Sequence, residues 1–507
     1  MSASGLSLTL LRKILLIACT LLLPCSSWAR VGEVVICDDI VEPLTLDPQK
    51  QFSEKNLTIC QQIFDGLLRF DPEGRIEPAL AVSWKRLDPL KVEFKLRKGV
   101  QFHNGEPFNA ESVKFTIDRY LDPKTGFPAL AFISSIDHVE IIDDETVVIV
   151  TKFPDGLLLN RLAGFVVMVP PGYVRKVGDI KFAAHPVGTG AFRFVSWEAG
   201  KSITLDHNPS YWMPGYPKAE GLTFRFIPTE RQLEELFAGR VDILTELPGT
   251  VTMAVAKNPG TMVVKKASFY TLAGTFNVAR GPLKDRRVRR ALNYAVDRNE
   301  LIRYDLMGNG QPLATFSMRG EEGFNPALRP YPYDPAKAAR LLKEAGYGKG
   351  FRLKAFVKAT GERAARILKV QWKKIGVDLD YEVKDEGELI RQIKSADLDL
   401  AFGGCPDPMA HTFFIQSISL FSQSPFSFIN IPEYDQRLLE MVSTNEDEKR
   451  ASLARKLDQY VYDEALSVFT YQRTKTYGVR RGVSFTPYVT GMPSLYSVKP
   501  ATAPFVP

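Results

Sequence analysis

The sequence predicts an α/β fold. Three observations support this class: a strand–helix–strand repeat over residues 351–383, a similar repeat over 222–244, and a helix between them that Asp334-Pro335 starts. Parallel strands joined through a helix form right-handed crossovers, and helices then cover the sheet. A sheet with covering helices is therefore expected.

The repeat over 351–383 carries the clearest signals. Residues 351–357 form a predicted strand, 362–375 a helix, and 377–383 a second strand. Gly376 follows the helix directly, and glycine ends helices because it adopts the left-handed conformation without strain. The helix before this repeat begins at Asp334-Pro335, and an Asp at the N-cap followed by a Pro is a common way for a helix to begin.

Strands and helices alternate over much of the remaining chain. Strands are predicted at 33–36, 92–96, 222–227 and 241–244, and helices over 54–68, after Asn109, up to Gly239, after Asp285 and over 449–463. In the helix after Asp285, apolar residues recur at the spacing of one buried helix face. The arginines at 286, 287, 289 and 290 lie between them and predict a solvated opposite face.

The first 29 residues predict export. Arg12-Lys13 is a short basic segment, 14–23 is an apolar core, and Ser27-Trp28-Ala29 offers small residues at a cleavage site. An apolar core this short is typical of a secretory signal and too short to span a bilayer. Cleavage is expected after Ala29, and the mature protein is expected in the periplasm. An uncleaved anchor and a lipid-modified Cys25 are the alternatives.

Charge and cysteine content narrow the function further. The formal net charge of +7 falls to +5 without Arg12 and Lys13, and charges of both signs are interspersed, so nucleic acid is not an expected partner. Three cysteines remain in the exported chain, Cys37, Cys60 and Cys405. An odd number leaves at least one thiol outside an intramolecular disulfide, and Cys37–Cys60 is a possible pair.

The motifs do not predict an enzyme. The sequence has no GxSxG nucleophile elbow and no HExxH zinc motif. Cys405, Met409 and His411 lie close enough in sequence to bind a transition metal. Pro406 and Pro408 stiffen this loop, and a packed loop without a metal is the preferred interpretation. No cofactor is expected.

A series of ordered motifs resembles the family 5 solute-binding proteins of peptide and nickel ABC importers. The motifs, in chain order, are LTLDP at 44–48, IFDGLL at 63–68, the FKLRKGVQFHNG segment at 94–105, PVGTG at 186–190, NPSYW at 208–212, FN at 276–277 with PLKD at 282–285, and the segment 337–346. Together they extend over nearly the whole exported chain.

The resemblance implies a two-lobed periplasmic-binding-protein fold (type II, cluster C) with an extra domain inserted in the first lobe. The implied division is a signal peptide at 1–29, lobe I at 30–75, 187–273 and 478–507, the inserted domain at 76–186, and lobe II at 274–477. The chain would cross between the lobes near 270–277 and again near 474–479.

The resemblance also implies reversible capture of a peptide or peptide-like solute and delivery to an ABC permease in the inner membrane, by a monomer without catalytic chemistry. The implied ligand-binding residues are Pro43, Thr45, Tyr270, Gly403, Gly404, Cys405 and Asp407. Peptide binders of the family often carry an Asp four residues before the Pro of a D-Y-x-D/E-P element, and this Asp pairs with the ligand's ammonium group. In this chain the proline is Pro408 and Gly404 stands at the position of the Asp. A free amino terminus therefore loses its partner unless Asp407 substitutes.

Three alternatives stay open. The same fold could bind a non-peptide ligand, either a hydrophobic small molecule or a nickel or other metal complex. A periplasmic chaperone-like protein would bind unfolded chains without a defined stoichiometry. A periplasmic enzyme would need a cluster of acid, base or nucleophile groups that the sequence does not indicate.

Overall fold

The structure is a computed structural model that describes residues 32–38, 42–393 and 397–501. The predicted signal peptide lies outside these residues. The strands are β1 (Glu33–Asp38), β2 (Leu68–Phe70), β3 (Ile76–Pro78), β4 (Ala81–Asp88), β5 (Lys91–Leu96), β6 (Ile136–Asp143), β7 (Thr146–Thr151), β8 (Phe192–Glu198), β9 (Ser202–His207), β10 (Gly221–Phe226), β11 (Ile243–Leu244), β12 (Thr261–Phe276), β13 (Gly310–Pro312), β14 (Phe351–Lys358), β15 (Val377–Lys384), β16 (Leu400–Pro406) and β17 (Ser467–Arg480).

The helices separate these strands along most of the chain. They are α2 (Glu54–Ile63), α3 (Ala110–Leu121), α4 (Leu158–Phe165), α5 (Pro171–Ala184), α6 (Thr229–Phe237), α7 (Thr252–Lys257), α8 (Arg286–Tyr294), α9 (Arg298–Asp305), α10 (Pro335–Glu344), α11 (Glu362–Lys373), α12 (Glu386–Gln392), α13 (Phe413–Leu420), α14 (Pro432–Val442) and α15 (Asp447–Glu464), with short 3-10 turns η1 (Leu130–Phe132), η2 (Gly281–Lys284) and η3 (Ala359–Gly361). The predicted α/β class is confirmed.

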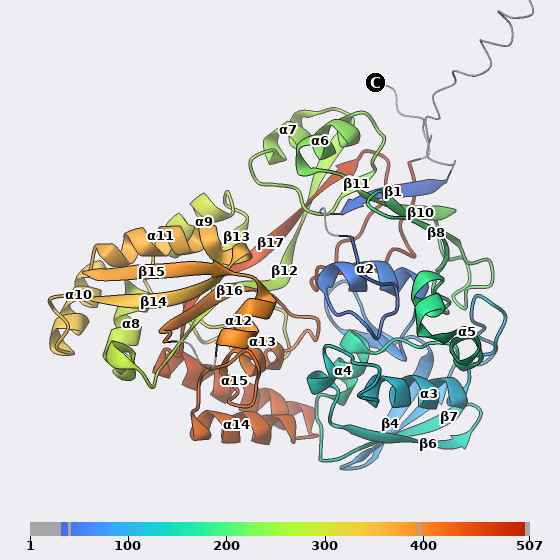
Figure 1. The fold of residues 1–507 in the computed structure, drawn as a ribbon, viewed down its shortest axis with the longest axis horizontal. Helices are drawn as coiled ribbons and strands as arrows, with labels where there is room; N and C mark the ends of the chain where they lie inside the picture. The colour runs from blue at the N-terminus through green and yellow to red at the C-terminus, as the bar shows by residue number, and fades with distance from the viewer. Residues whose placement is uncertain (1–31, 39–41, 394–396, 502–507) are drawn as a thin grey trace, which may run out of the picture.

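The molecule has two halves that lie side by side (Figure 1). One half contains β14, β15 and β16 with covering helices, and the other contains β1, β8 and β10. A separate antiparallel sheet, β4-β5-β7-β6, lies below the second of these. The predicted boundaries of the two lobes and the inserted domain stay predictions.

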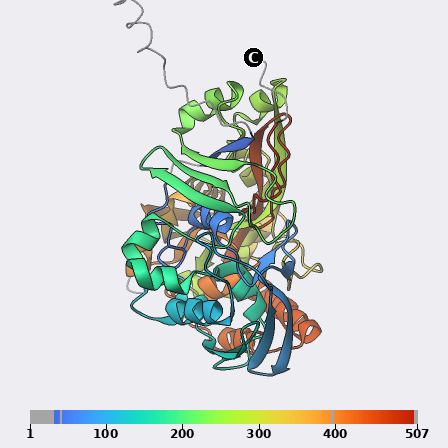
Figure 2. The ribbon, with the colours of Figure 1, turned by 90° about the vertical axis from the view of Figure 1, so that its right-hand side faces the viewer.

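Two long strands connect the halves. The largest sheet has the order β15-β14-β16-β12-β17-β11-β1-β10-β9-β8, so β12 and β17 stand at its centre. They pair antiparallel, and Figure 2 shows them side by side from a second direction. Their register shifts between Ala267 and Thr271. On one side of this shift, β17 also pairs with β11, and on the other side β12 pairs with β16. We call residues 268–271 and 472–474 the junction.

The strand–helix–strand repeat over 351–383 forms as predicted. β14 and β15 pair in parallel over their full lengths, and α11 connects them. Trp372 of α11 is fully buried beneath the helix, and its indole N–H donates to the carbonyl of Leu292 at 3.0 Å. The apolar face of α11 therefore packs toward α8, as its period predicts.

The helix after Asn109 also begins where the sequence indicates. The side chain of Asn109 accepts a hydrogen bond from the backbone N–H of Ser112, and the Ser112 hydroxyl accepts from that of Asn109. This reciprocal capping box satisfies two donors that the first turn of a helix leaves without partners. It fixes α3 against the antiparallel sheet.

The arginines of α8 correct a prediction. Arg289 was expected on a solvated face, but its side chain is buried, and its guanidinium donates to the backbone carbonyl of Glu464 at 2.7 Å and to that of Leu283 at 2.9 Å. Arg290 likewise donates to the carbonyl of Asp463 at 2.9 Å. These side chains fix α8 to the end of α15, because the last carbonyls of a helix have no intrahelical partner.

The possible Cys37–Cys60 disulfide does not form, since Cys60 carries a free thiol. Cys37 packs with Val35 in a cluster on one face of β1, whereas Cys60 packs with Val34 and Ile36 on the opposite face. Successive side chains of a strand point to opposite faces, so the two sulfur atoms lie on different sides of the sheet.

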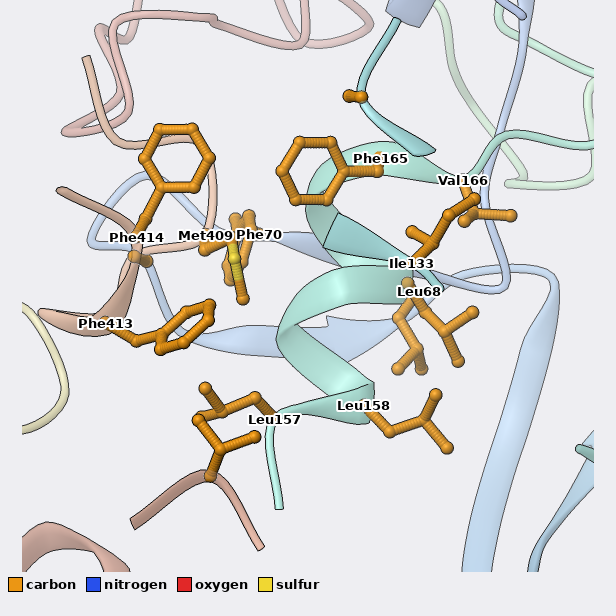
Figure 3. Close-up of a cluster of buried hydrophobic side chains, with 14 of the residues drawn as sticks. Leu68, Phe70, Ile133, Leu157, Leu158, Phe165, Val166, Met409, Phe413 and Phe414 are labelled. Carbon is orange, nitrogen blue, oxygen red and sulfur yellow. The ribbon is translucent and has the colours of Figure 1, made fainter. Parts of the chain in front are cut away.

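The largest of the apolar clusters in the described residues extends across the two halves (Figure 3). Phe165 of α4 and Ile133 come from the half with the antiparallel sheet, and Met409, Phe413 and Phe414 come from the other. The rings of Phe132 and Phe414 lie 4.7 Å apart, and those of Phe165 and Phe414 lie 6.0 Å apart. The halves are thus in direct apolar contact.

Candidate functional site

The junction brings residues from both halves together. On β12, Tyr270 lies opposite Pro406 of β16, and the next residue, Thr271, lies opposite Cys405. Gly403 and Gly404 follow on the same strand pair, with the backbone N–H of Gly404 donating to the Thr360 hydroxyl at 3.3 Å. Tyr270, Gly403, Gly404 and Cys405, four of the predicted ligand-binding residues, therefore lie together.

Tyr270 occupies the space beside Gly404. A Cβ atom added at Gly404 would lie 1.8 Å from the Tyr270 hydroxyl oxygen, far inside contact distance. Burial raises the pKa of Tyr270 to about 12, and its hydroxyl bonds to the Thr360 side chain. A neutral phenol therefore takes the place in which a side chain at position 404 would lie.

Gly404→Ala is expected to lower the unfolding temperature, because its methyl group cannot coexist with Tyr270 in this position. Inserting a methyl group into a packed site costs about 1–3 kcal/mol. Thermal unfolding followed by circular dichroism measures the loss, and in a Tyr270→Ala background, compared with Tyr270→Ala alone, the same glycine substitution is expected to cost much less. An unchanged unfolding temperature for Gly404→Ala would show that Tyr270 does not fill this space.

Next to Tyr270 lies a group of four charged side chains. β17 contributes Arg473 and Lys475, α2 contributes Glu54, and the segment after β11 contributes Glu246. Lys475 Nζ lies 2.5 Å from Glu54 Oε1 and 3.2 Å from Glu246 Oε1. Arg473 pairs with Glu246, and its guanidinium carbon lies 5.4 Å from the centre of the Tyr270 ring. We call these four residues with Tyr270 the junction cluster.

The charges in this cluster stabilise one another. Burial alone would raise the pKa of Glu246, but Lys475 and Arg473 hold it below its usual value. Burial would likewise lower the pKa of Arg473, and the neighbouring Glu246 overcomes this effect. Glu246 and Arg473 therefore stay charged at neutral pH, and their opposite charges hold the two side chains in defined positions.

A cavity lies beside the cluster. It encloses about 330 Å³ of space outside the protein atoms, part of which is open to solvent, and is lined by Glu54, Thr58, Thr245, Glu246, Lys475, Tyr477, Gly491 and Pro493. A larger cavity of about 700 Å³ lies between α2 and α4. Its buried acid, Asp65, already accepts from Thr189, Tyr211 and Trp212. The first cavity combines charged groups with the connection between the halves and is the better candidate.

Other predicted site residues lie elsewhere. Pro43 is buried, and the Thr45 hydroxyl accepts from the backbone N–H of Asp47 at 3.1 Å. The Thr45 carbonyl accepts from the Asn56 side chain at 2.8 Å. These contacts hold the loop against α2, and the structure does not place Pro43 or Thr45 in the junction cluster.

Asp407 stabilises its own loop. Its carboxylate accepts from the backbone N–H of Met409 at 2.7 Å and of His411 at 2.9 Å, and its side chain is fully buried. Burial raises the pKa of Asp407 to about 7. The carboxylate is thus engaged by backbone amides and does not replace the side chain that Gly404 lacks.

The possible metal ligands are not gathered in the described part of the chain. His411 is buried, burial lowers its pKa to about 4, and its Nδ1 accepts from the backbone N–H of Phe413 at 2.9 Å. Within residues 32–38, 42–393 and 397–501, no group of three His, Cys, Asp or Glu side chains is arranged to hold a metal ion. The structure gives no support to a metal at Cys405, Met409 and His411.

The sequence did not reveal the charged members of the cluster. Arg473 and Lys475 stand two residues apart in a strand that is otherwise mainly apolar or uncharged, which is a weak signal of a polar site on one face. Glu246 and Glu54 carry no local pattern at all. Their relation to the strand appears only in the folded chain.

Comparisons with known proteins give the family context. The model of the bacterial extracellular solute-binding proteins, family 5 (middle part), matches residues 75–421. The glutathione-binding protein GsiB of Pectobacterium atrosepticum is 30% identical over 356 residues, which cover 69% of each chain. None of the helices in the described ranges is long and apolar enough to cross a bilayer.

Solved structures share the whole architecture. The periplasmic binding protein DppA of Helicobacter pylori, in complex with the peptide STSA, has a TM-score of 0.78 at 24% identity and covers 93% of this chain and 98% of its own. The binding protein AgaA of A. tumefaciens R10, in complex with agropinic acid, has a TM-score of 0.77 at 25% identity and covers 92% and 98%. The predicted cluster C binding-protein fold is confirmed.

Proposed function

This chain belongs to the bacterial extracellular solute-binding proteins of family 5, and we propose that it captures a peptide or peptide-like solute in the periplasm for an ABC permease. Membership of this family makes it a solute-binding component of ABC transport and not an enzyme. The peptide-like solute, the periplasmic location, the permease in the inner membrane and the monomeric state are parts of the proposal.

The observation that carries the proposal is the position of the junction cluster. Tyr270 pairs with Pro406 of β16 in one half, whereas Lys475 pairs with Lys266 on the other side of the register shift and lines the cavity with Glu54 and Glu246. We expect a solute that lies between this cavity and Tyr270 to contact both halves, and its binding would favour the arrangement in which they meet. Closed and open forms could then be distinguished by the permease.

The relatives favour a small, polar solute. GsiB is a glutathione-binding protein, and AgaA binds agropinic acid. The charged side chains of the cluster fit such a ligand, because ionic groups in a closed site need partners of opposite charge. A hydrophobic ligand would not pair with the charged side chains of Arg473 and its neighbours. A nickel ion that enters without its own ligands would need protein ligands, and the described residues contain no group of three His, Cys, Asp or Glu side chains that could hold it.

Isothermal titration calorimetry tests the proposal. The exported protein, freed of co-purified solute by partial unfolding and refolding, is titrated with glutathione, alanyl-alanine, N-acetyl-alanyl-alanine and a Ni(II)–histidine complex. The expected result is saturable binding of one solute per chain for a peptide-like member of this panel. Binding of the nickel complex alone would support the metal-complex alternative, and binding only of unfolded polypeptide would support the chaperone-like one.

A further inference from the structure

We infer that Arg473 binds a carboxylate of the solute, and that this protein selects solutes by a negative group and not by a free amine. The inference rests on the proposed function, since it names the solute chemistry that the junction cluster recognises. It follows from two observations: Lys475 and Arg473 differ in the donors they have left for a ligand, and the acids of the cluster already pair with these two cations.

Lys475 has no donor left for a ligand. Its ammonium group has three N–H donors. They reach Glu54 at 2.5 Å, Glu246 at 3.2 Å and the carbonyl of Gly491 at 3.1 Å. This lysine is therefore a fixed structural cation, and a solute carboxylate would have to displace one of these partners to reach it.

Arg473 lies two residues earlier on the same face of β17 and has donors to offer. A guanidinium has five N–H donors in a planar fork that matches a carboxylate. Among the described residues, its side chain pairs with Glu246 and stacks over Tyr270, and 30% of it is exposed. Glu246 on one edge and the phenol ring on one face orient the group, so its remaining N–H donors are pre-positioned for a second anion.

No acid of the cluster is in the same position for an amine. Glu54 and Glu246 both contact Lys475, and Glu246 also pairs with Arg473. Asp305, on the other side of the junction, accepts from the Tyr471 hydroxyl, and burial raises its pKa. At position 404 the Tyr270 hydroxyl stands where an acidic side chain would reach, so an ammonium group has no free carboxylate to meet.

The other half of the molecule brings one more positive charge toward the junction. Arg363 of α11 lies near enough to Asp305 to oppose the rise in pKa that burial causes there. Where the halves close over a bound carboxylate, this charge would strengthen the attraction, because charges interact more strongly where water is excluded.

Three dipeptide probes separate the two modes of recognition. N-acetyl-alanyl-alanine has a carboxylate and no amine, alanyl-alanine amide has an amine and no carboxylate, and N-acetyl-alanyl-alanine amide has neither. Calorimetry with the wild-type chain is expected to show that removing the carboxylate weakens binding about thirtyfold or more, the loss typical of a truncated buried ion pair. Removing the amine by acetylation is expected to weaken binding less than threefold, since the acids of the cluster are already engaged by Lys475 and Arg473.

Arg473→Gln is expected to lose the affinity for N-acetyl-alanyl-alanine by the same factor, with no further loss for the doubly blocked probe. Arg473→Lys is expected to keep part of the affinity for N-acetyl-alanyl-alanine. The control Arg437→Gln, at an ion pair on the surface of α14, is expected to bind every probe as the wild type does. An unfolding temperature close to wild type establishes that the variant is folded. If Arg473→Gln does not fold, the wild-type comparison of acid and amide still decides.

Two outcomes would overturn the inference in different ways. If alanyl-alanine amide binds as tightly as N-acetyl-alanyl-alanine, the solute is captured but not through a carboxylate, and the proposed function stands alone. If neither these probes nor glutathione binds at a single site, the proposed function fails and the role of Arg473 fails with it.

Discussion

Replacing Arg119 by Met should lower the free energy of unfolding by about 3–5 kcal/mol, because the change leaves a buried carboxylate without its partner. Arg119 lies on α3, and its guanidinium donates to Asp47 Oδ1 at 3.1 Å and pairs with Asp179 at 2.9 Å. The side chain of Asp47 is fully buried, and that of Arg119 is 8% exposed. The pair joins α3, which packs on the antiparallel sheet, to the loop at 42–53.

Chemical denaturation followed by tryptophan fluorescence measures this loss, with Arg175→Met as the matched control. Arg175 also forms an ion pair from a helix of the same region, at 2.9 Å from Glu111, but the two side chains are 59% and 49% exposed. Exposed pairs contribute about 0–1 kcal/mol. Equal losses for the two variants would contradict the account of Asp47 as a buried anion held by Arg119.

Phe414→Ala should shift the protein toward an open form, because the side chain lies in the apolar contact between the halves. Phe414 is 3% exposed and packs against Phe132 and Phe165 across that contact. Burying a phenylalanine contributes about 1.5–3 kcal/mol, so the ratio of closed to open molecules should fall roughly tenfold to hundredfold. Small-angle X-ray scattering without solute should then report a larger radius of gyration.

Phe102→Ala separates this effect from a general loss of stability. Phe102 is 2% exposed and packs against Phe108, at 6.3 Å between ring centres, inside the predicted inserted domain. Its loss should lower the unfolding temperature and leave the radius of gyration unchanged. If Phe414→Ala leaves the radius unchanged as well, the contact does not control the closure that we propose.

The sequence predicted those elements whose signals are local. The strand–helix–strand repeat over 351–383 carries both its apolar period and its stop at Gly376, and β14, α11 and β15 form there. The cap at Asn109 needs only Ser112 three residues later. The family resemblance supplied the overall fold, because ordered motifs over a whole chain are far more specific than any one of them.

The site was only partly predictable, because its charged residues meet through long-range contacts. Tyr270, Gly403, Gly404 and Cys405 were found by resemblance and lie together at the junction. The expectation for the LTLDP loop rested on the same resemblance, yet the loop's clearest contact is the ion pair of Asp47 with Arg119, more than seventy positions away. No local pattern distinguishes a buried loop residue from one that faces a solute.

The partners of Arg473 show the same limit from the other direction. Glu246 is more than two hundred positions away in sequence, and Glu54 is more than four hundred from Lys475. Only the pairing of β17 with β12 and β11 brings these segments together. The burial of the Arg289 side chain was not predicted for a similar reason, since its partner Glu464 belongs to a helix that is distant in the sequence.

Native mass spectrometry of the protein purified from the periplasm tests the central claim most directly. Spectra are recorded before and after mild denaturation, and the released molecule is fragmented. The account predicts one non-covalent solute per chain, released on denaturation and carrying a carboxylate. A bound metal ion, a neutral apolar molecule, or a mixture of polypeptides without a fixed ratio would contradict it.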